Sequence, residues 1–276
     1  MTPEEVGRQR RAPSATSPYQ RVIPTVFLAI KALIDNNISV VEYGAQIQYR
    51  YGDKRYLMVC ETKPSDTVSW LTKVNKNPEW VIPDDQLLFA SQILLETDFP
   101  RIYPQPRPWV GYRDHQSWAH YIGKPEANLN YGIIYLVPMS LVGFTLQDTI
   151  RVKPTFDDKF HILTPKPAPY MRSLIQMLRA FQLNDVRRYR VQMDLVSFVC
   201  VGLLHTSMEG LPYYKPRDEA FKKKTLDAVK VVRAWDWGPV DPILSQIVHR
   251  IVCEPQFIWD LTVDSAMPPV PDIATV

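Results

Sequence analysis

Glu61 and Lys63 are the residues whose types and spacing most clearly suggest chemistry. They end a predicted strand, and because side chains alternate along a strand, both lie on one face. A carboxylate there supplies the oxygen ligands that Mg²⁺ prefers. An ammonium group beside it stabilises the charge that develops when a phosphate reacts. The pair can therefore act together in metal-dependent chemistry on a phosphate ester.

The strand that carries this pair has a predicted partner earlier in the chain. Residues 38–62 are rich in β-branched and aromatic side chains, and Gly52-Asp53 in their middle favours a two-residue hairpin turn. In that register Lys63 lies opposite Glu42, and Glu42 is the diagonal neighbour of Glu61, roughly 7–8 Å away. Two long carboxylates at this separation can converge on one ion. A slip of one residue would turn Glu42 to the opposite face.

The elements around this hairpin are predicted from hydrophobic periodicity. Helices are expected at residues 22–35, 84–97, 169–183, 186–205, 217–233 and 242–252. Strands are expected at residues 38–51, 55–62, 131–137 and 141–146, with a further edge strand at 160–163. The predicted fold class is therefore α/β (α+β), with a mixed central sheet flanked by helices and a mainly helical C-terminal half.

Composition suggests how the chain is divided. Residues 1–21 are polar and basic and form an expected disordered arm, because they lack the apolar surface that offsets ordering entropy. Residues 22–164 form an α/β domain, residues 165–264 a helical subdomain packed on it, and residues 265–276 a Pro-rich tail.

The order helix, strand, turn, strand ending in Glu61-Thr62-Lys63, helix and further strands resembles the restriction-endonuclease-like nuclease superfamily, whose motif is written PD-(D/E)xK. The resemblance spans roughly residues 22–146. It implies a nucleic-acid-binding protein with a nuclease-like core, either a Mg²⁺-dependent phosphodiesterase or a degenerate inactive relative. It also implies that Glu61 and Glu42 hold the metal, while Lys63 positions the attacking water.

The first half of the family motif differs here, because Tyr43-Gly44-Ala45-Gln46 stands where a Pro-Asp pair is expected. Glu42 substitutes for the missing acid in the hairpin described above, Asp53 does so if the turn is longer, and Gln46 is a neutral alternative. The competing interpretation is a surface hairpin on which Glu61 and Lys63 are solvated or pair with each other, as such residues commonly do on exposed strands.

Two basic clusters are candidate contacts for nucleic-acid phosphates. They comprise Arg8, Arg10 and Arg11 in the arm, and Arg187, Arg188 and Arg190 on a predicted helix. The alternative for the second cluster is a solvated helix face. The arm and tail also suit a structural, coat-like nucleic-acid-packaging protein that assembles as a homo-oligomer. A protein-interaction module that binds through Pro- and Trp-rich loops is a further alternative.

Several other classes of protein lack their sequence signals. The 276 residues contain no Gly-rich phosphate loop, Gly-x-Ser-x-Gly elbow or zinc-ligand spacing. Three widely spaced cysteines predict reduced thiols and no disulfides. No apolar run approaches the roughly 20 residues that span a bilayer, and no signal peptide is evident. An intracellular protein, cytoplasmic or nuclear and without a membrane partner, is expected.

Overall fold

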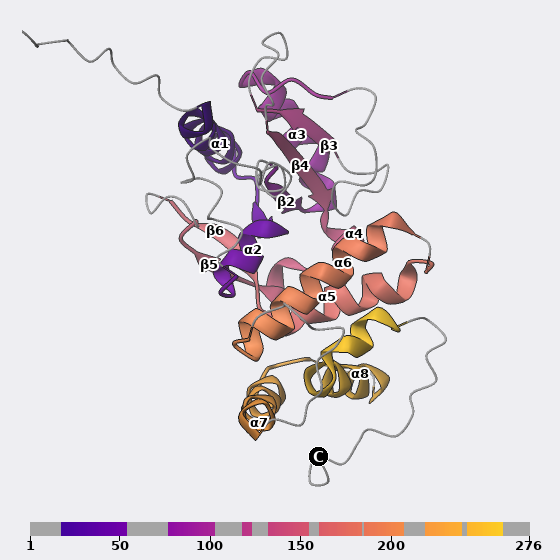
Figure 1. The fold of residues 1–276 in the computed structure, drawn as a ribbon. Helices are drawn as coiled ribbons and strands as arrows, with labels where there is room; N and C mark the ends of the chain where they lie inside the picture. The colour runs from indigo at the N-terminus through magenta and orange to yellow at the C-terminus, as the bar shows by residue number, and fades with distance from the viewer. Residues whose placement is uncertain are drawn as a thin grey trace, which may run out of the picture.

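A mixed sheet with helices on both sides forms the centre of the molecule (Figure 1). The computed structural model describes residues 18–53, 77–102, 118–122, 132–154, 160–183, 185–206, 219–238 and 242–261, with the backbone alone described at 18–25 and 186. The predicted α/β class, the mixed central sheet and the mainly helical C-terminal half are confirmed.

The sheet has six strands in the order β3-β4-β2-β1-β6-β5. Their bounds are β1 Val41–Tyr43, β2 Glu79–Ile82, β3 Trp118–Tyr121, β4 Ile133–Pro138, β5 Thr149–Val152 and β6 Ile162–Pro165. Strand β1 pairs antiparallel with β2 and parallel with β6, while β2 pairs parallel with β4. The outer strands β3 and β5 run antiparallel to their neighbours β4 and β6. The sheet is therefore mixed, and its central strands are nonlocal neighbours.

The predicted hairpin register around Glu42 is wrong. Glu42 lies opposite Trp80 of β2, and the other side of β1 pairs with β6, so this strand has no edge left for residues 55–62. The segment after β1 is also not extended, because Ala45–Arg50 form helix α2. Gly44 causes this change of direction with φ 58° and ψ −130°, a backbone conformation that glycine alone adopts readily.

Two further strand predictions need correction. The predicted strand at 141–146 is wrong, since α4 spans Met139–Val142 and the 3₁₀ helix η5 spans Leu146–Asp148. The strand predicted at 160–163 exists as β6, but it lies between β1 and β5 and is not an edge. Strands β2, β3 and β5 were not predicted, because each has only four residues and its pattern is short.

One face of the sheet is covered by α1 (Pro18–Asp35) and α3 (Leu87–Glu96), which follows the 3₁₀ helix η4 (Asp84–Gln86). Helix α1 buries Val26, Ala29, Ile30 and Leu33, a spacing that places all four on one side. Strand residues Trp80, Ile82, Ile134 and Leu136 complete this core. The predicted helices at 22–35 and 84–97 are confirmed.

The opposite face is covered by the helical C-terminal half. It comprises α5 Pro167–Ala180, α6 Val186–Ser197, the π-helical turn η6 Phe198–Leu203, α7 Glu219–Arg233, α8 Pro242–Cys253 and the 3₁₀ helix η8 Pro255–Trp259. These helices share one core with Val41, Tyr43, Val81, Tyr135 and Val137 of the sheet. The central strands are buried on both faces, so β4 is apolar along its whole length, whereas β1 and β2 each contain one buried acid, Glu42 and Glu79. The four predicted C-terminal helices are confirmed, and the division into two domains stays a prediction.

Two of the three cysteines, Cys200 and Cys253, lie in the described part of the chain, and neither forms a disulfide bond. Cys200 is fully buried in the helical core. Burial raises the pKa of the half-buried Cys253 to about 11, and neighbouring Glu254 adds to this effect. The Cys253 thiol therefore stays protonated near neutral pH, which makes it a poor nucleophile.

Candidate binding site at the carboxyl ends of β2 and β4

The parallel strands β2 and β4 end side by side, with Ile82 opposite Pro138. Each is followed at once by a short helix, η4 after Pro83 and α4 after Pro138. In sheets with parallel strands, ligands bind preferentially beyond the carboxyl ends, because the connections there leave a crevice. This end of the sheet is therefore the first place to look for a site.

Asp84 joins the two strand ends. Its Oδ2 accepts a hydrogen bond of 2.9 Å from the backbone N–H of Ser140, and its Oδ1 accepts one from the Ser140 hydroxyl. The backbone N–H of Ser140 is among the first in α4 and has no partner within that helix. The carboxylate therefore satisfies a group that would otherwise need water.

A cavity of about 650 Å³ lies beside this contact. Its lining residues are Pro83, Asp84, Asp85, Met139, Ser140, Phe144, Thr145, Leu146 and Gln147. Proline, methionine, phenylalanine and leucine give the cavity an apolar wall, whereas both acids lie exposed at its rim. We call this cavity the β2–β4 cleft.

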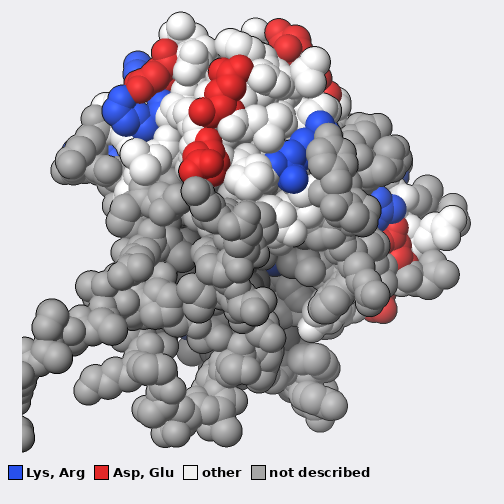
Figure 2. All heavy atoms as spheres, turned by 90° about the horizontal axis from the view of Figure 1, so that it is seen from above, with Lys and Arg blue, Asp and Glu red and all other residues white. Residues whose placement is uncertain are grey.

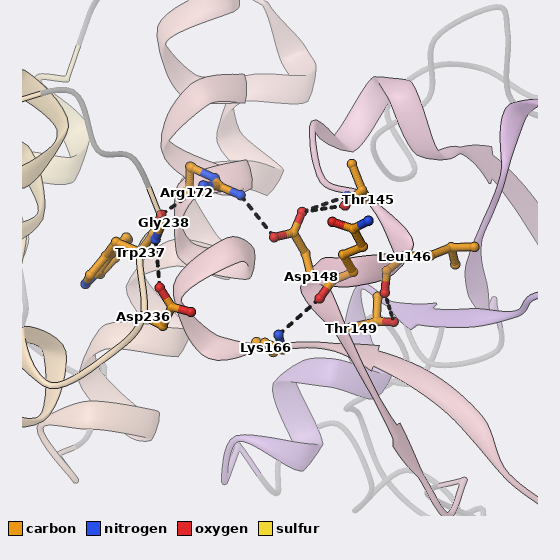
Figure 3. Close-up of polar contacts among 10 residues, drawn as sticks. Thr145, Leu146, Asp148, Thr149, Lys166, Arg172, Asp236, Trp237 and Gly238 are labelled. Carbon is orange, nitrogen blue, oxygen red and sulfur yellow. Dashed lines mark hydrogen bonds and ion pairs between the residues drawn. The ribbon is translucent and has the colours of Figure 1, made fainter.

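Residues 145–147 form one wall of the cleft, and hydrogen bonds to Asp148 and Lys166, which are not among the lining residues, hold this wall in place (Figure 3). Asp148 Oδ2 accepts hydrogen bonds from the backbone N–H of Thr145 at 2.8 Å and from its hydroxyl at 3.1 Å. The Lys166 ammonium donates to the carbonyl of Gln147 at 3.0 Å. This wall is therefore pre-formed, which lowers the entropy that ligand binding would otherwise cost.

Arg172 of α5 links this wall to the helical half. It lies 3.4 Å from Asp148 Oδ1 and also donates to the carbonyl of Trp237 at 3.2 Å (Figure 3). Its guanidinium is directed at these two acceptors, and it is not among the lining residues. Among the described residues that line the cleft there are two carboxylates, Asp84 and Asp85, and no basic side chain. The electrostatics of the cleft favour cationic or hydrogen-bond-donating ligands.

A buried acid, Glu79, lies at the other end of β2. Glu79 is 5% exposed, and its Oε2 has no hydrogen-bond partner among the described residues. Its carboxylate lies close to Gly44. A Cβ atom added at Gly44 would lie 2.1 Å from Oε2 of Glu79. The tight contact explains why the chain needs glycine here for space as well as for backbone conformation.

Glu42 is fully buried in β1, and both of its carboxylate oxygens accept hydrogen bonds from Arg50. Arg50 of α2 donates through Nε to Oε1 and through Nη2 to Oε2, the latter at 3.0 Å. The same guanidinium donates to the carbonyl of Lys153 at 2.8 Å. Glu61 and Lys63 lie outside the described residues. The metal-binding and catalytic roles of these three residues therefore stay predictions.

The two alternative ligands that the sequence suggested lie in the buried region around α2. Asp53 is 2% exposed and accepts a hydrogen bond of 2.5 Å from the hydroxyl of Ser197. Gln46 is also buried. Within the described ranges, no group of three or more His, Cys, Asp or Glu side chains is placed to hold a metal ion.

The arginines of α6 bond to groups of the protein itself. Arg188 is 2% exposed, and its guanidinium donates to the carbonyls of Leu178 and Leu261. Arg187 pairs with Asp185 at 2.6 Å, and Arg190 pairs with Asp194 at 3.1 Å. Arg188 is therefore not part of a solvated helix face.

The arm arginines Arg8, Arg10 and Arg11 lie outside the described residues. Nucleic-acid binding by either basic cluster stays a prediction. Figure 2 shows one face of the molecule, on which the described acidic side chains form a short row across uncharged surface and the described basic ones lie toward its margins.

The sequence did contain part of the signal for the cleft. A helix was predicted to begin at Asp84, and residues 138–140 lay between two predicted strands. Each of these segments follows an apolar run, which is where carboxyl-end sites occur. No local pattern indicated that the two segments are neighbours. Their contact depends on the parallel pairing of β2 with β4, and β3 lies between these two strands in the sequence.

Comparisons with known proteins give no family. No protein-family model matches the chain, and no curated protein matches it. Among solved structures, the chain is similar to an antigenic nucleotidyltransferase-like protein from Paracoccidioides brasiliensis, with 12% identity over 88% of this chain and 95% of that chain, at a TM-score of 0.38. A likeness this distant carries no argument about the site. No helix in the described ranges has the length and apolarity needed to cross a membrane.

Proposed function

We propose that the chain is a binding protein whose β2–β4 cleft takes an organic cation, namely an amine or guanidinium carried on an apolar body. One observation supports this most directly. A cavity of about 650 Å³ opens at the ends of two parallel strands, and its described lining residues include two carboxylates and no lysine or arginine. Its volume lies within the range of roughly 300–1,000 Å³ that is usual for small-molecule sites.

The two acids have different roles in this proposal. Asp84 is occupied by Ser140 and fixes the shape of the cleft. Asp85 lines the same cavity, is exposed, and has no recorded partner among the described residues, so it is the group that receives the cation. Leu146, which is 40% exposed, offers the apolar surface against which the rest of the ligand packs, and the buried Met139 and Phe144 also line the cavity.

Titration calorimetry at low salt tests the proposal with phenethylamine and agmatine as cations and phenylacetate as the matched anion. Both cations are expected to bind and phenylacetate is not. Asp85→Asn should weaken binding by about two- to fivefold, the effect of an exposed ion pair. Glu219→Gln also removes one negative charge, at an exposed position on α7, and serves as the control. Equal binding of phenylacetate, or an unchanged affinity in Asp85→Asn, would overturn the proposal.

A Mg²⁺-dependent nuclease is a second proposal, and the Glu61-Thr62-Lys63 sequence supports it. The described part of the site does not fit the metal well, because Arg50 occupies both oxygens of Glu42. Purified protein should cleave single- or double-stranded nucleic acid with Mg²⁺ or Mn²⁺, and Glu61→Ala or Lys63→Ala should abolish cleavage. Activity that survives both changes would refute this proposal. Salt-sensitive binding without cleavage, lost on deleting residues 1–21, would favour the packaging alternative.

A further inference from the structure

Helix α3 carries large apolar side chains on its solvent side. Leu88 is 67% exposed, Phe89 is 53% exposed and Leu95 is 41% exposed, whereas Ala90, Ile93 and Leu94 are buried against the sheet. A helix that is apolar all round is normally covered on all sides. This one is covered on one side only, so its outer side is a surface of the kind that binds partners.

This surface is continuous with the rim of the cleft. The 3₁₀ helix η4, which contains Asp84 and Asp85, runs directly into α3, so Leu88 and Phe89 lie about one turn further along the same helical segment. Gln92 and Leu95 extend the same exposed stripe along α3. An extended occupant could therefore fill the cleft and cover the stripe at the same time.

The charges along this stripe are all of one sign. Asp84, Asp85 and Glu96 are exposed, and the sequence from Asp84 to Glu96 contains no lysine or arginine. Complementary charge selects a partner that is both basic and apolar.

We propose that the cleft and the outer side of α3 together dock a peptide segment of a partner protein, in which Lys or Arg stands beside large apolar residues. The cation enters the cleft at Asp85, and the apolar residues cover Leu88 and Phe89. This inference rests on the cation-binding cleft proposed above. A second copy of the chain fits less well, because a symmetric contact places the same acids opposite one another.

A phage-displayed library of random 12-residue peptides, selected on the immobilised full chain, tests the inference. The expected result is enrichment of peptides that combine Lys or Arg with Leu, Phe, Met or Trp. A synthetic peptide of the enriched sequence should bind Leu88→Ser about tenfold more weakly, as expected when an apolar anchor is lost. Leu183→Ser, at a site 69% exposed and outside α3, should bind it as the unchanged chain does.

The outcomes separate this inference from the function on which it rests. If phenethylamine still binds in an Asp85-dependent way but no basic, apolar peptide is enriched, the peptide partner is refuted and the cleft proposal stands. Enrichment of acidic peptides also overturns the inference, as does a selected peptide whose affinity is unchanged by Leu88→Ser. Concentration-dependent dimerisation in sedimentation velocity, if Leu88→Ser abolishes it, also overturns the inference, because the outer sides of α3 in two copies of the chain would then cover each other.

Discussion

Asp84 and Ser140 lie 56 residues apart in sequence, and yet one carboxylate binds both the backbone N–H and the hydroxyl of the other residue. The contact ties η4 to α4 at the point where β2 and β4 end. It therefore sets the distance between two sides of the cleft. Asp85, the next residue, lines the same cavity without this contact, so the two acids can be tested against each other.

Asp84→Ala should destabilise the fold more than Asp85→Ala does. The first change leaves the Ser140 N–H without its acceptor, and because the site is exposed, water can replace part of what is lost. A loss of about 1 kcal/mol in the free energy of unfolding is expected for Asp84→Ala, typical of one such hydrogen bond. Urea unfolding of both variants measures the difference, and equal effects would show that the contact carries no stability.

Replacing Arg50 alone should destabilise the fold more than replacing Glu42 and Arg50 together. Glu42 is fully buried, whereas Arg50 is 25% exposed, so removing the arginine takes a bidentate counter-charge away from a buried carboxylate. Arg50→Met should lower the free energy of unfolding by about 3 kcal/mol, near the low end of the range for broken buried pairs. The double variant Glu42→Gln with Arg50→Met should recover part of that loss. A double-mutant cycle in urea that shows simple additivity would contradict this coupling.

The long helices could be predicted because their signal is local. The apolar spacing of Val26, Ile30 and Leu33 repeats every turn, and it predicted α1 without knowledge of anything else in the chain. The short strands could not be placed in the same way. Strand β1 has three residues, and both of its partners lie far along the chain. A strand this short is defined by its neighbours more than by its own residues.

The hairpin prediction failed at a single residue. Ile38 to Tyr51 has the composition of a strand, but Gly44 turns the chain with a positive φ and the residues after it favour helix. That error moved Glu42 to the wrong neighbour. The cleft was missed for a different reason, since Asp84 was recognised only as the start of a helix. Its contact with Ser140 follows from strand order, which local patterns do not specify.

Gly44→Ala should be among the most destabilising single changes in α2 and its flanks. Alanine there meets the unfavourable backbone conformation and also the Glu79 carboxylate, with only 2.1 Å available. Gly52→Ala is the matched control, because Gly52 also has a positive φ but has nothing within 4 Å of the added Cβ. Backbone strain alone accounts for about 1–3 kcal/mol at either site.

The difference between these two glycine variants isolates the clash with Glu79. Gly44→Ala should unfold at a lower urea concentration than Gly52→Ala, and adding Glu79→Ala to Gly44→Ala should restore part of the difference. Identical midpoints for the two single variants would mean that the close approach of Gly44 to Glu79 has no energetic consequence.

His120 should make stability fall as the pH falls below about 6.5. Its Nδ1 lies 2.9 Å from the carbonyl oxygen of Phe99, which can only accept, so Nδ1 carries the proton and Nε2 accepts from the Ser91 hydroxyl at 2.9 Å. Burial lowers the pKa of His120, although the bond to Phe99 opposes this shift. The unfolded chain, with a histidine pKa near 6.5, then binds more protons than the folded chain does. Stability is full above that pH and declines toward the lower folded pKa.

Replacing His120 with Gln should therefore flatten the dependence of unfolding free energy on pH between 7.5 and 5.5. One titrating group contributes a slope of at most about 1.4 kcal/mol per pH unit. Some slope should remain, because burial also lowers the pKa of His249 and acts with the same sign. His161→Gln, at an exposed position, is the control and should leave the profile unchanged. If His120→Gln has the same pH profile as the unchanged chain, His120 must be protonated equally in the folded and unfolded states, which its two hydrogen bonds argue against.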